Sequence, residues 1–370
     1  MNNKDKNPNV PNLRFPEYSI PWKECSLGDV LTICHGKDYK HLNKGKYPVL
    51  GTSGIFEYVD DYLCDWPCAM IGRKGATLDK PHFMDKPFWC VDTLYYSKPH
   101  INQNPKWQYY LFQTIDWMKM NESSGIPSLR SSTIESLKIN VPDINEQNKI
   151  VKFLDKIDQR IELQNKIIED LKLQKEYIIQ EIFKDIDNDN KILLSDVLID
   201  YSEKTIYNNQ FPVLSSTASG MYFQNEYFNK EAASEDTTGY KIVPKGYCTY
   251  RSMSDTGVFN FNQQNLIDYG IVSPAYPVFY SNSYDVAFIA LYLNKAENIK
   301  KKILQLKTGG TRFALSFKSL CNLSIPDITK EKQQSIMNMI AAFEKKINNE
   351  KQIQQNMIVQ KQYLLNNMFI

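Results

Sequence analysis

The sequence lacks any long hydrophobic run, although 42% of its 370 residues are hydrophobic. No stretch approaches the roughly 18 consecutive apolar residues of a membrane-spanning helix. The start, residues 1–11, is polar and rich in Asn, unlike the basic and then apolar start of a secretion signal. We therefore expect a globular, cytoplasmic protein with no membrane partner.

A regular cysteine pattern is also missing, because the seven cysteines are odd in number and scattered along the chain. This distribution does not fit a disulfide framework. Cys64 and Cys68, with Cys90 and His82 nearby, can be considered as zinc ligands, but their spacing is not that of paired CxxC motifs. We interpret them as reduced thiols in a core and expect no bound metal.

The chain has little net charge, with 44 Lys and Arg against 42 Asp and Glu, a formal charge of +2. A protein that binds nucleic acid by itself usually shows a clear basic excess. Any contact with DNA must therefore depend on local groups of cations and on partner proteins.

Catalytic motifs are absent as well. Residues 104–107 (NPKW) come nearest to the Asn-Pro-Pro-aromatic motif of amino-methyltransferases, but they lack the second proline and a Gly-rich cofactor loop. Residues 307–310 (KTGG) do not form a phosphate-binding loop. Asp327, Glu331 and Lys332 stand at an expected helix start, where acidic residues are common. We expect a chain that is not an enzyme and binds no cofactor.

What the sequence does contain is an internal repeat with an offset of 186 residues. The segment 141–183 begins VPDINEQ and ends QKEYIIQEIF, and the segment 325–369 begins IPDITKE and ends QKQYLLNNMF. In this alignment Ile150 matches Ile336 and Tyr177 matches Tyr363. The chain therefore carries two copies of one element.

Each copy has the pattern of a long helix. Pro142 and Pro326 end the preceding strands, Asp143, Asn145, Asp327 or Thr329 can cap, and neither Pro nor Gly follows. Steps of four and three residues place apolar side chains at eight of ten positions in the first copy and at seven of ten in the second, as in a coiled coil. The predicted seam of the helix pair includes Ile150, Leu154, Ile157, Ile161, Ile336, Ile340, Phe343 and Ile347.

Polar residues interrupt both seams at equivalent positions, Gln164 and Glu350, and Lys175 and Lys361. They either fix the register of the pair or mark places where the seam opens to solvent or to a partner. A helix from Glu146 to Phe183 has 38 residues, or roughly 57 Å at about 1.5 Å per residue. Such a rod cannot fold alone, so we expect the two copies to pack on each other as an antiparallel spacer.

The repeat extends weakly into the segments before each helix. Residues 26–33 (SLGDVLTI) echo residues 193–200 (LLSDVLID), and residues 48–53 (PVLGTS) echo residues 212–217 (PVLSST). Short β-like runs separated by Gly, Asn, Asp and Pro turns indicate mixed α/β domains. The predicted fold class is α+β, with two such domains separated by two long helices that pack as an antiparallel coiled coil with a pseudo-twofold internal repeat. The predicted boundaries are a first domain at 1–143 with an N-terminal arm at 1–22, a first helix at 144–187, a second domain at 188–327 and a second helix at 328–370.

Together these features resemble the specificity subunits of Type I restriction-modification systems. The resemblance covers nearly the whole chain, although no single motif is specific. It rests on the order of several short motifs together with the duplicated helix. These motifs are residues 11–16 (PNLRFP) with Trp22, 27–30 (LGDV), 71–77 (IGRKGAT), 124–130 (SGIPSLR), and 141–143 with Glu146 and Gln147.

The resemblance implies two target recognition domains, each of which reads one half of an interrupted, bipartite DNA site. The helices would set the gap between the halves and dock methyltransferase subunits. The implied partners are double-stranded DNA, two methyltransferase subunits and restriction (translocase) subunits. S-adenosylmethionine would bind the methyltransferase subunit, and ATP and Mg would bind the restriction subunit, so that DNA methylation is done by partners.

Candidate DNA-contacting residues are cations and small polar groups in loops, because these reach phosphates and base edges. The densest group is residues 35–46 (HGKDYKHLNKGK), which can also be an ordinary solvated loop. The Arg residues beside Gly loops can equally pair with a neighbouring carboxylate. In the second domain the motifs are looser. The predicted residues are Lys37, Tyr39, Lys40, Lys44, Ser53, Arg73, Lys74, Thr77, Ser124, Arg130, Ser216, Thr217, Arg251, Ser252, Lys307, Thr311 and Arg312.

Two other functions remain open from the sequence. The chain can be a fragment of a single-chain restriction-methylation enzyme whose catalytic half is encoded elsewhere. It can also be a coiled-coil scaffold without a role in nucleic-acid binding, which fits its near-neutral charge.

Overall fold

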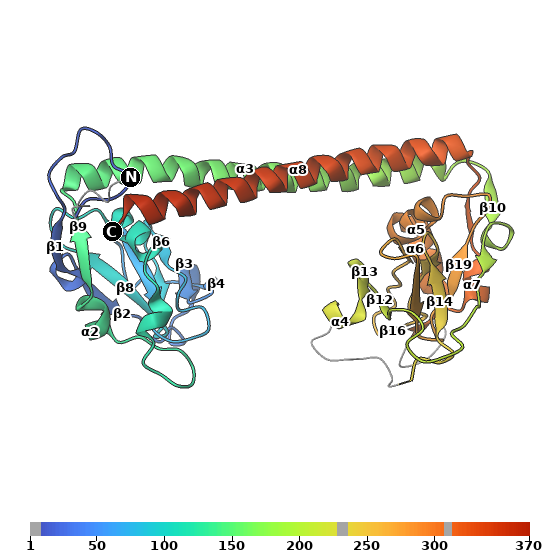
Figure 1. The fold of residues 1–370 in the computed structure, drawn as a ribbon, viewed down its shortest axis with the longest axis horizontal. Helices are drawn as coiled ribbons and strands as arrows, with labels where there is room; N and C mark the ends of the chain where they lie inside the picture. The colour runs from blue at the N-terminus through green and yellow to red at the C-terminus, as the bar shows by residue number, and fades with distance from the viewer. Residues whose placement is uncertain (1–8, 228–235, 307–312) are drawn as a thin grey trace, which may run out of the picture. The chain divides into compact units, whose positions relative to one another are not determined.

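The structure is a computed structural model that describes residues 9–227, 236–306 and 313–370. The chain divides into two compact units. Unit 1 consists of Met1–Lys166 and Lys351–Ile370, and unit 2 consists of Ile167–Glu350. Each unit contains one mixed α/β domain and parts of both long helices (Figure 1). Among the described residues, no helix has the length and apolarity needed to cross a membrane.

Unit 1 contains two main sheets, and helix α1 (Pro105–Phe112) lies against strands β5, β6 and β8 of the first of them. One sheet has the strand order β2-β8-β5-β6, and the other has the order β4-β3-β7, in which β3 and β7 are parallel. Strands β1 and β9 form a separate antiparallel pair, and β9 ends just before the first long helix begins. The elements are β1 (Lys23–Ser26), η1 (Leu27–Asp29), β2 (Leu31–His35), β3 (Lys44–Gly51), β4 (Gly54–Val59), β5 (Cys68–Gly72), β6 (His82–Met84), β7 (Trp89–Cys90), β8 (Leu94–Pro99), α1 (Pro105–Phe112), η2 (Trp117–Met120), α2 (Ser131–Glu135) and β9 (Lys138–Val141).

Unit 2 has one four-stranded sheet, of order β11-β19-β15-β17, and several two-stranded pairs. Helices α5 and α6 pack into its core. The elements are β10 (Lys191–Leu193), η3 (Leu194–Asp196), β11 (Ile199–Asp200), β12 (Leu214–Thr217), β13 (Gly220–Phe223), α4 (Gln224–Tyr227), β14 (Lys241–Pro244), β15 (Cys248–Thr249), β16 (Met253–Ser254), β17 (Asn262–Gln263), β18 (Tyr269–Val272), β19 (Val278–Tyr280), α5 (Val286–Lys295), α6 (Glu297–Gln305), β20 (Phe313–Ala314), α7 (Phe317–Cys321) and β21 (Ser324–Pro326).

The two domains share one topology. In both four-stranded sheets the strands have equivalent order, so that β2, β8, β5 and β6 correspond to β11, β19, β15 and β17. Each domain also has a hairpin, β3–β4 or β12–β13, whose first strand lies parallel to a later segment. Strand pair β1–β9 corresponds to β10–β21. The weak sequence echo between the domains is therefore a repeat of the fold.

The long helices are α3 (Ile144–Ile186) and α8 (Lys330–Met368). In unit 1 the start of α3 packs with the end of α8, and in unit 2 the end of α3 packs with the start of α8. The pair is therefore antiparallel within each unit. The predicted fold class, two mixed α/β domains with an antiparallel pair of long helices and an internal repeat, is confirmed.

Two ion pairs between α3 and α8 show the internal symmetry directly. In unit 1, Lys361 Nζ lies 2.6 Å from Asp158 Oδ1, and in unit 2, Lys175 Nζ lies 3.4 Å from Glu344 Oε1. Asp158 and Glu344 are 186 residues apart, as are Lys175 and Lys361. The two polar seam lysines therefore make equivalent bonds across the helices, which favours a role in fixing the register.

The seam differs from a free-standing coiled coil at both ends. Ile150 and Leu154 are part of the domain core of unit 1, and Ile336 and Ile340 are part of the domain core of unit 2. Ile157 packs against the first of these cores, whereas Ile161 and Phe343 are half-buried. Among the clusters of described residues, the small one of Ile347 with Ile168 and Leu171 involves the two helices alone. Near each end of the helix pair, the seam residues therefore contact a sheet domain as well as the other helix.

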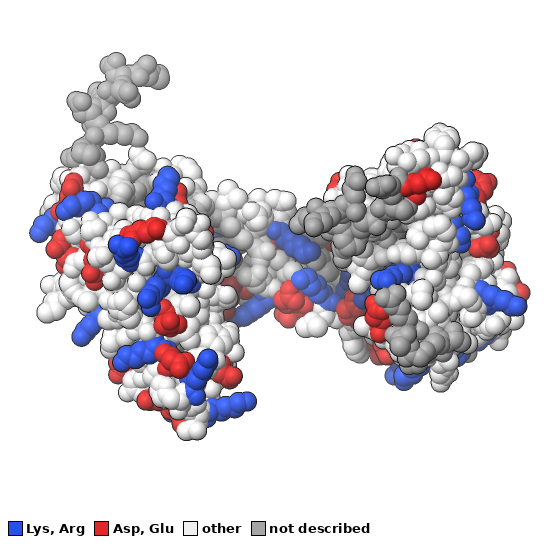
Figure 2. All heavy atoms as spheres, turned by 90° about the horizontal axis from the view of Figure 1, so that it is seen from below, with Lys and Arg blue, Asp and Glu red and all other residues white. Residues whose placement is uncertain are grey.

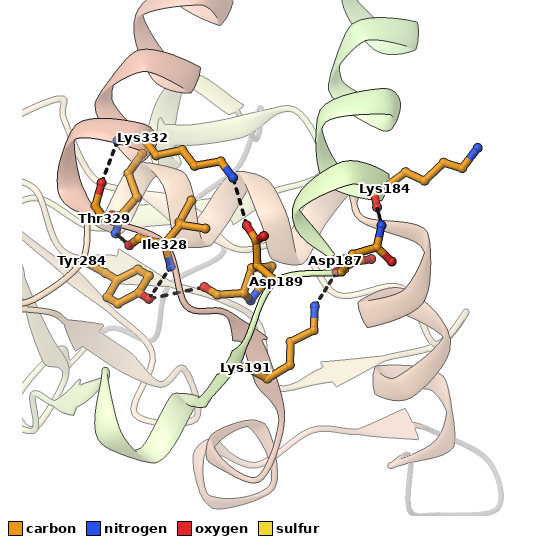
Figure 3. A network of polar contacts seen from close by, with 11 residues as sticks. Lys184, Asp187, Asp189, Lys191, Tyr284, Ile328, Thr329 and Lys332 are labelled. Carbon is orange, nitrogen blue, oxygen red and sulfur yellow. Dashed lines mark hydrogen bonds and ion pairs between the residues drawn. The ribbon is translucent and has the colours of Figure 1, made fainter.

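In unit 2, a polar network lies where α3 ends and α8 begins (Figure 3). Tyr284 Oη donates to Asp327 Oδ1 at 2.9 Å and accepts from the Ile328 N–H at 3.1 Å. Lys332 Nζ lies 2.9 Å from Asp189 Oδ2. Asp327 thus binds a tyrosine hydroxyl, and the cap of α8 comes from Thr329, whose Oγ1 accepts from the Lys332 N–H at 3.3 Å. Asp143 caps α3 in the corresponding way.

Candidate nucleic-acid interface

The loop after β5 carries the predicted pair Arg73 and Lys74 in unit 1. Gly72 ends the strand where a side chain would not fit, because a Cβ there would lie 2.3 Å from Leu78 Cα. The Arg73 carbonyl accepts from the Leu129 N–H at 2.9 Å. The backbone is therefore fixed, while the side chains of Arg73 and Lys74 are exposed. This is a suitable arrangement for two cations that contact a ligand.

The run that contains Ser124 and Arg130 lies beside this loop, because the Gly75 N–H donates to the Pro127 carbonyl at 3.0 Å. Ser124 is exposed. Arg130 Nε lies 2.6 Å from Glu122 Oε2. The guanidinium of Arg130 is therefore engaged with a carboxylate of its own loop, the alternative that the sequence left open.

The turn of the β3–β4 hairpin reaches the same loop. Gly54 and Gly75 have φ values of +107° and +136°, which favour glycine. A Cβ on Gly75 would lie 3.4 Å from Thr52 Oγ1, so the turn and the loop are in contact. Ser53 is exposed at this turn, and Thr77 is half-buried. Three of the predicted groups, distant in sequence, thus meet in unit 1.

The lysine-rich segment that leads into β3 presents its cations to solvent, and its Lys44 is the first residue of that strand. Lys37, Lys40 and Lys44 are exposed, and none of them forms an ion pair with another described residue. Tyr39 is half-buried and packs edge-on against Phe56, with 5.5 Å between the ring centres. These lysines are available to a phosphate backbone, whereas Tyr39 also has a packing role.

Lys and Arg form no continuous patch on the face of unit 1 seen in Figure 2. They appear there as separate groups with Asp and Glu between them (Figure 2, at the left). This distribution agrees with the net charge of +2. Binding to a polyanion must therefore rely on a few placed cations, because the surface as a whole supplies little attraction.

In unit 2 four predicted residues line one hollow. Arg251 and Ser252 follow β15, as Arg73 and Lys74 follow β5, and Ser216 and Thr217 belong to the β12–β13 hairpin. The hollow has two connected parts with volumes of about 360 and 660 Å³. Both units therefore place a hairpin turn beside an arginine loop. Residues shared by the two parts are Ser215, Gln224, Arg251, Met253 and Tyr276.

The profile of one protein family, described as "Type I restriction modification DNA specificity domain", matches residues 19–173. Residues 19–173 belong to this family. The resemblance to Type I specificity subunits that the motifs predicted is thereby confirmed.

Comparisons with curated proteins and with solved structures give further similarities. A curated relative, the "Type I restriction enzyme EcoprrI specificity subunit" of Escherichia coli, is 26% identical over 153 residues, which are 40% of this chain and 38% of that protein's length. The crystal structure of a Type I restriction-modification S subunit from M. genitalium has a TM-score of 0.54 at 17% identity and covers 98% of this chain and 99% of that one. A second structure, from a study of complex assembly and conformational transition of the type I R-M system, has a TM-score of 0.60 at 14% identity and covers 95% and 98%. The fold of this chain is therefore similar to these two structures over 95–98% of its length.

Several residues of the motifs that carry the resemblance have structural roles. Arg14 in the N-terminal arm forms two bonds of 2.8 and 2.7 Å with the carboxylate of Glu146. Trp22 is buried and packs against Phe369. Gln147, also buried, accepts from the Asn104 N–H at 2.9 Å and so ties the start of α1 to α3. These residues join the arm, the domain and the helix pair.

The predicted contacts Lys307, Thr311 and Arg312 lie outside the described residues. Phe313 follows them directly and pairs with Ser254 in the strand pair β16–β20. All the candidate DNA contacts stay predictions.

Sequence reasoning missed several side chains that complete the two sites. Thr52 lies at the contact between hairpin and loop in unit 1, and Gln224 and Tyr276 line the hollow in unit 2. Tyr276 is far from Arg251 in the sequence, and no motif surrounds it. The 48–53 and 212–217 echo would have pointed to Thr52, had it been extended to every polar residue of the hairpin turn.

The cysteines considered as zinc ligands lie in a hydrophobic cluster of unit 1. The sulfur atoms of Cys64 and Cys68 are 4.0 Å apart, and His82 Nε2 lies 3.0 Å from the Thr52 carbonyl oxygen. The hydrogen bond with Cys64 and burial raise the pKa of Cys68, and burial raises the pKa of Cys90. Within the described ranges, no group of three or more His, Cys, Asp and Glu side chains could hold a metal ion.

Proposed function

We propose that the chain is the DNA sequence-specificity subunit of a Type I restriction-modification complex and has no catalytic activity of its own. It recognises a bipartite, interrupted DNA site and positions the methyltransferase and restriction subunits on it. S-adenosylmethionine binds the methyltransferase subunit, and ATP and Mg bind the restriction subunit, because the sequence of this chain lacks the motifs of the loops that hold these ligands.

One observation supports this proposal above others, the duplication of the same surface in both units. Each domain has an arginine loop after the third strand of an equivalent sheet, and each loop lies beside a hairpin turn. A β-ribbon and cationic loops are elements that enter DNA grooves. Two such readers in one chain suit a site of two halves, because both must bind at once for high specificity.

The helix pair supports the docking of two methyltransferase subunits. Large apolar side chains on α3 and α8 are exposed at positions that the repeat relates. In each unit one such set is 37–68% exposed, and exposed apolar groups mark protein interfaces. Two equivalent sets suit two copies of one partner. The sets are Phe153, Ile353, Val359 and Tyr363 in unit 1, and Met339, Ile167, Leu173 and Tyr177 in unit 2.

The decisive experiment maps methylated adenines across the genome with and without the gene for this chain. We expect the loss of one two-part motif when the gene is deleted. An unchanged methylome would contradict the proposal and favour the scaffold. A neighbouring gene with the cofactor loop and the Asn-Pro-Pro-aromatic motif as a separate protein would exclude the single-chain alternative.

Variants at the candidate contacts separate DNA reading from folding. Arg73→Ala and Lys40→Ala should abolish methylation but leave the assembly with methyltransferase subunits intact, because both side chains are exposed. Failure to assemble would show instead that these residues are structural.

Docking is tested by removing one apolar set at a time. The double variant Leu173→Ser with Tyr177→Ser should bind one methyltransferase subunit in native mass spectrometry, and Val359→Ser with Tyr363→Ser should do the same. Two subunits on each variant would show that these side chains do not form the docking surface.

A further inference from the structure

The hollow of unit 2 offers one guanidinium that has no partner among the described residues. Arg251 is exposed, and its side chain forms no hydrogen bond or ion pair with another described residue. Its equivalent in unit 1, Arg73, donates from Nη1 to the Asp92 carbonyl at 3.2 Å. The five N–H donors of Arg251 are therefore available to a ligand in the hollow.

The backbone around Arg251 is held rigidly on both sides. Tyr250 is fully buried, and its hydroxyl donates to the Leu315 carbonyl at 3.2 Å. The Ser252 hydroxyl donates to the Ala275 carbonyl at 2.7 Å, and the Ser252 carbonyl accepts from the Leu315 N–H at 2.9 Å. A fixed backbone lowers the entropy cost of placing the side chain against a ligand.

The two hairpin hydroxyls predicted as DNA contacts are already used within unit 2. Ser216 Oγ accepts from Asn262 Nδ2 at 2.8 Å, and Thr217 Oγ1 donates to the Gly220 carbonyl at 2.9 Å. They shape the wall of the hollow. Among the described residues that line the hollow, Arg251 is the one cation.

The lining favours a base edge over a phosphate. Met253, Phe259 and Tyr276 give the hollow apolar and aromatic walls. Asp255 also belongs to the lining, and although it already has an interaction partner, its carboxylate repels a phosphate. An arginine fork matches the two acceptors O6 and N7 of guanine, which is the commonest specific contact to a base in the major groove.

We propose that this hollow receives the major-groove edge of a guanine in the half-site read by unit 2, with Arg251 donating to O6 and N7. The proposal rests on the proposed function and adds to it the base that is read and the residue that reads it. It also predicts that this half-site contains a G·C pair.

The test uses the full complex of this chain with its methyltransferase subunits. Arg251→Gln and Arg251→Lys should each lower the preference for guanine at one position of one half-site by roughly 10- to 100-fold, the discrimination of a bidentate pair. The other half-site should stay unchanged, and so should the motif of a control variant, Lys245→Gln, because Lys245 is exposed and lies outside the hollow. Lysine keeps the charge but loses the fork, so Arg251→Lys would preserve binding if the contact were to a phosphate.

A second measurement locates the base. Competition gel shifts compare site DNA with DNA in which 7-deazaguanine, which lacks the N7 acceptor, replaces each guanine in turn. We expect wild type to lose affinity at one position and Arg251→Gln to be insensitive there. Uniform weakening without a change of base preference, full activity of Arg251→Lys, or a half-site without a G·C pair would overturn the proposal. Failure of the proposed function would look different, because the methylome would then not depend on the chain at all.

Discussion

The ion pair between Arg14 and Glu146 allows a quantitative test of how the N-terminal arm is held. The Arg14 side chain is 9% exposed and that of Glu146 is 1% exposed. Arg14 Nη2 also donates to the Ile20 carbonyl at 2.5 Å. Arg14→Met removes the cation and leaves the buried carboxylate of Glu146 without its partner.

The expected cost follows from this burial. Removal of one partner from a buried pair typically costs about 3–5 kcal/mol. Glu146 lies in the first turn of α3, where the helix dipole favours a negative charge, so we expect the lower end, about 3 kcal/mol. For a unit of this size, roughly 2–4 °C in Tm per kcal/mol gives a decrease of about 6–12 °C.

Urea and thermal unfolding followed by tryptophan fluorescence provide the assay, because Trp22 is buried in the core of unit 1. Glu17→Gln is the matched control, because it removes a bond between the same arm and α3, Lys149–Glu17, whose side chains are about half exposed. That variant should be indistinguishable from wild type. Arg14→Met with Glu146→Leu should recover most of the stability. A loss below about 1 kcal/mol for Arg14→Met would refute the reasoning.

Three further predictions concern the helix pair and its junctions. Gln147→Leu and Gln333→Leu should each lower the free energy of unfolding by about 1–3 kcal/mol. These buried amides accept equivalent hydrogen bonds from the N–H groups of Asn104 and Asp285, at 2.9 and 2.8 Å. Urea denaturation measures both variants, and a loss of stability in only one of them would contradict the equivalence of the two bonds. Burial and the bond to Asp327 raise the pKa of Tyr284 to about 12, above the usual value of about 10. The neutral tyrosine therefore stabilises the fold fully below pH 10, and this contribution to the free energy of unfolding declines between pH 10 and 12. A Tyr284→Phe variant should lack this part of the decline in unfolding experiments across that range, and a decline identical to that of wild type would contradict the prediction. Four residues inserted after both Gln164 and Glu350 should lengthen each helix by about 6 Å and keep the register of the ion pairs between the helices. The gap between the two halves of the recognised site, measured by mapping the methylome, should then change by one or two base pairs. An unchanged gap with full activity would show that the helices are docking surfaces only.

The long helices were predictable because the sequence pattern that specifies them is local and occurs twice in the chain. A seam of apolar residues with steps of four and three, free of Pro and Gly, determines a helix wherever it occurs. The 186-residue offset then implied a symmetric pair. Expected helix limits of Glu146–Phe183 compare with Ile144–Ile186 in the structure, where Asp143 supplies the cap.

The candidate site was predictable only as a set of loops. Arginine next to glycine indicates an exposed cation on a tight turn, but its partner depends on which other loop lies beside it. Thus Arg130 pairs with Glu122, Arg73 bonds to a backbone carbonyl, and Arg251 remains open to the hollow. Sequence spacing contains none of these differences, because the partners come from distant strands of the sheet.

The sequence by itself determined the duplication, the two helices, their apolar seam and the absence of catalytic motifs, since each of these is a local or periodic pattern. Only the tertiary structure decided that Ile150 and Ile336 enter the domain cores, that the hydroxyls of Ser216 and Thr217 are used internally, and that Tyr276 stands beside Arg251. The physical reason is that burial and hydrogen bonding depend on contacts between segments far apart in the chain, which form only when the sheets assemble.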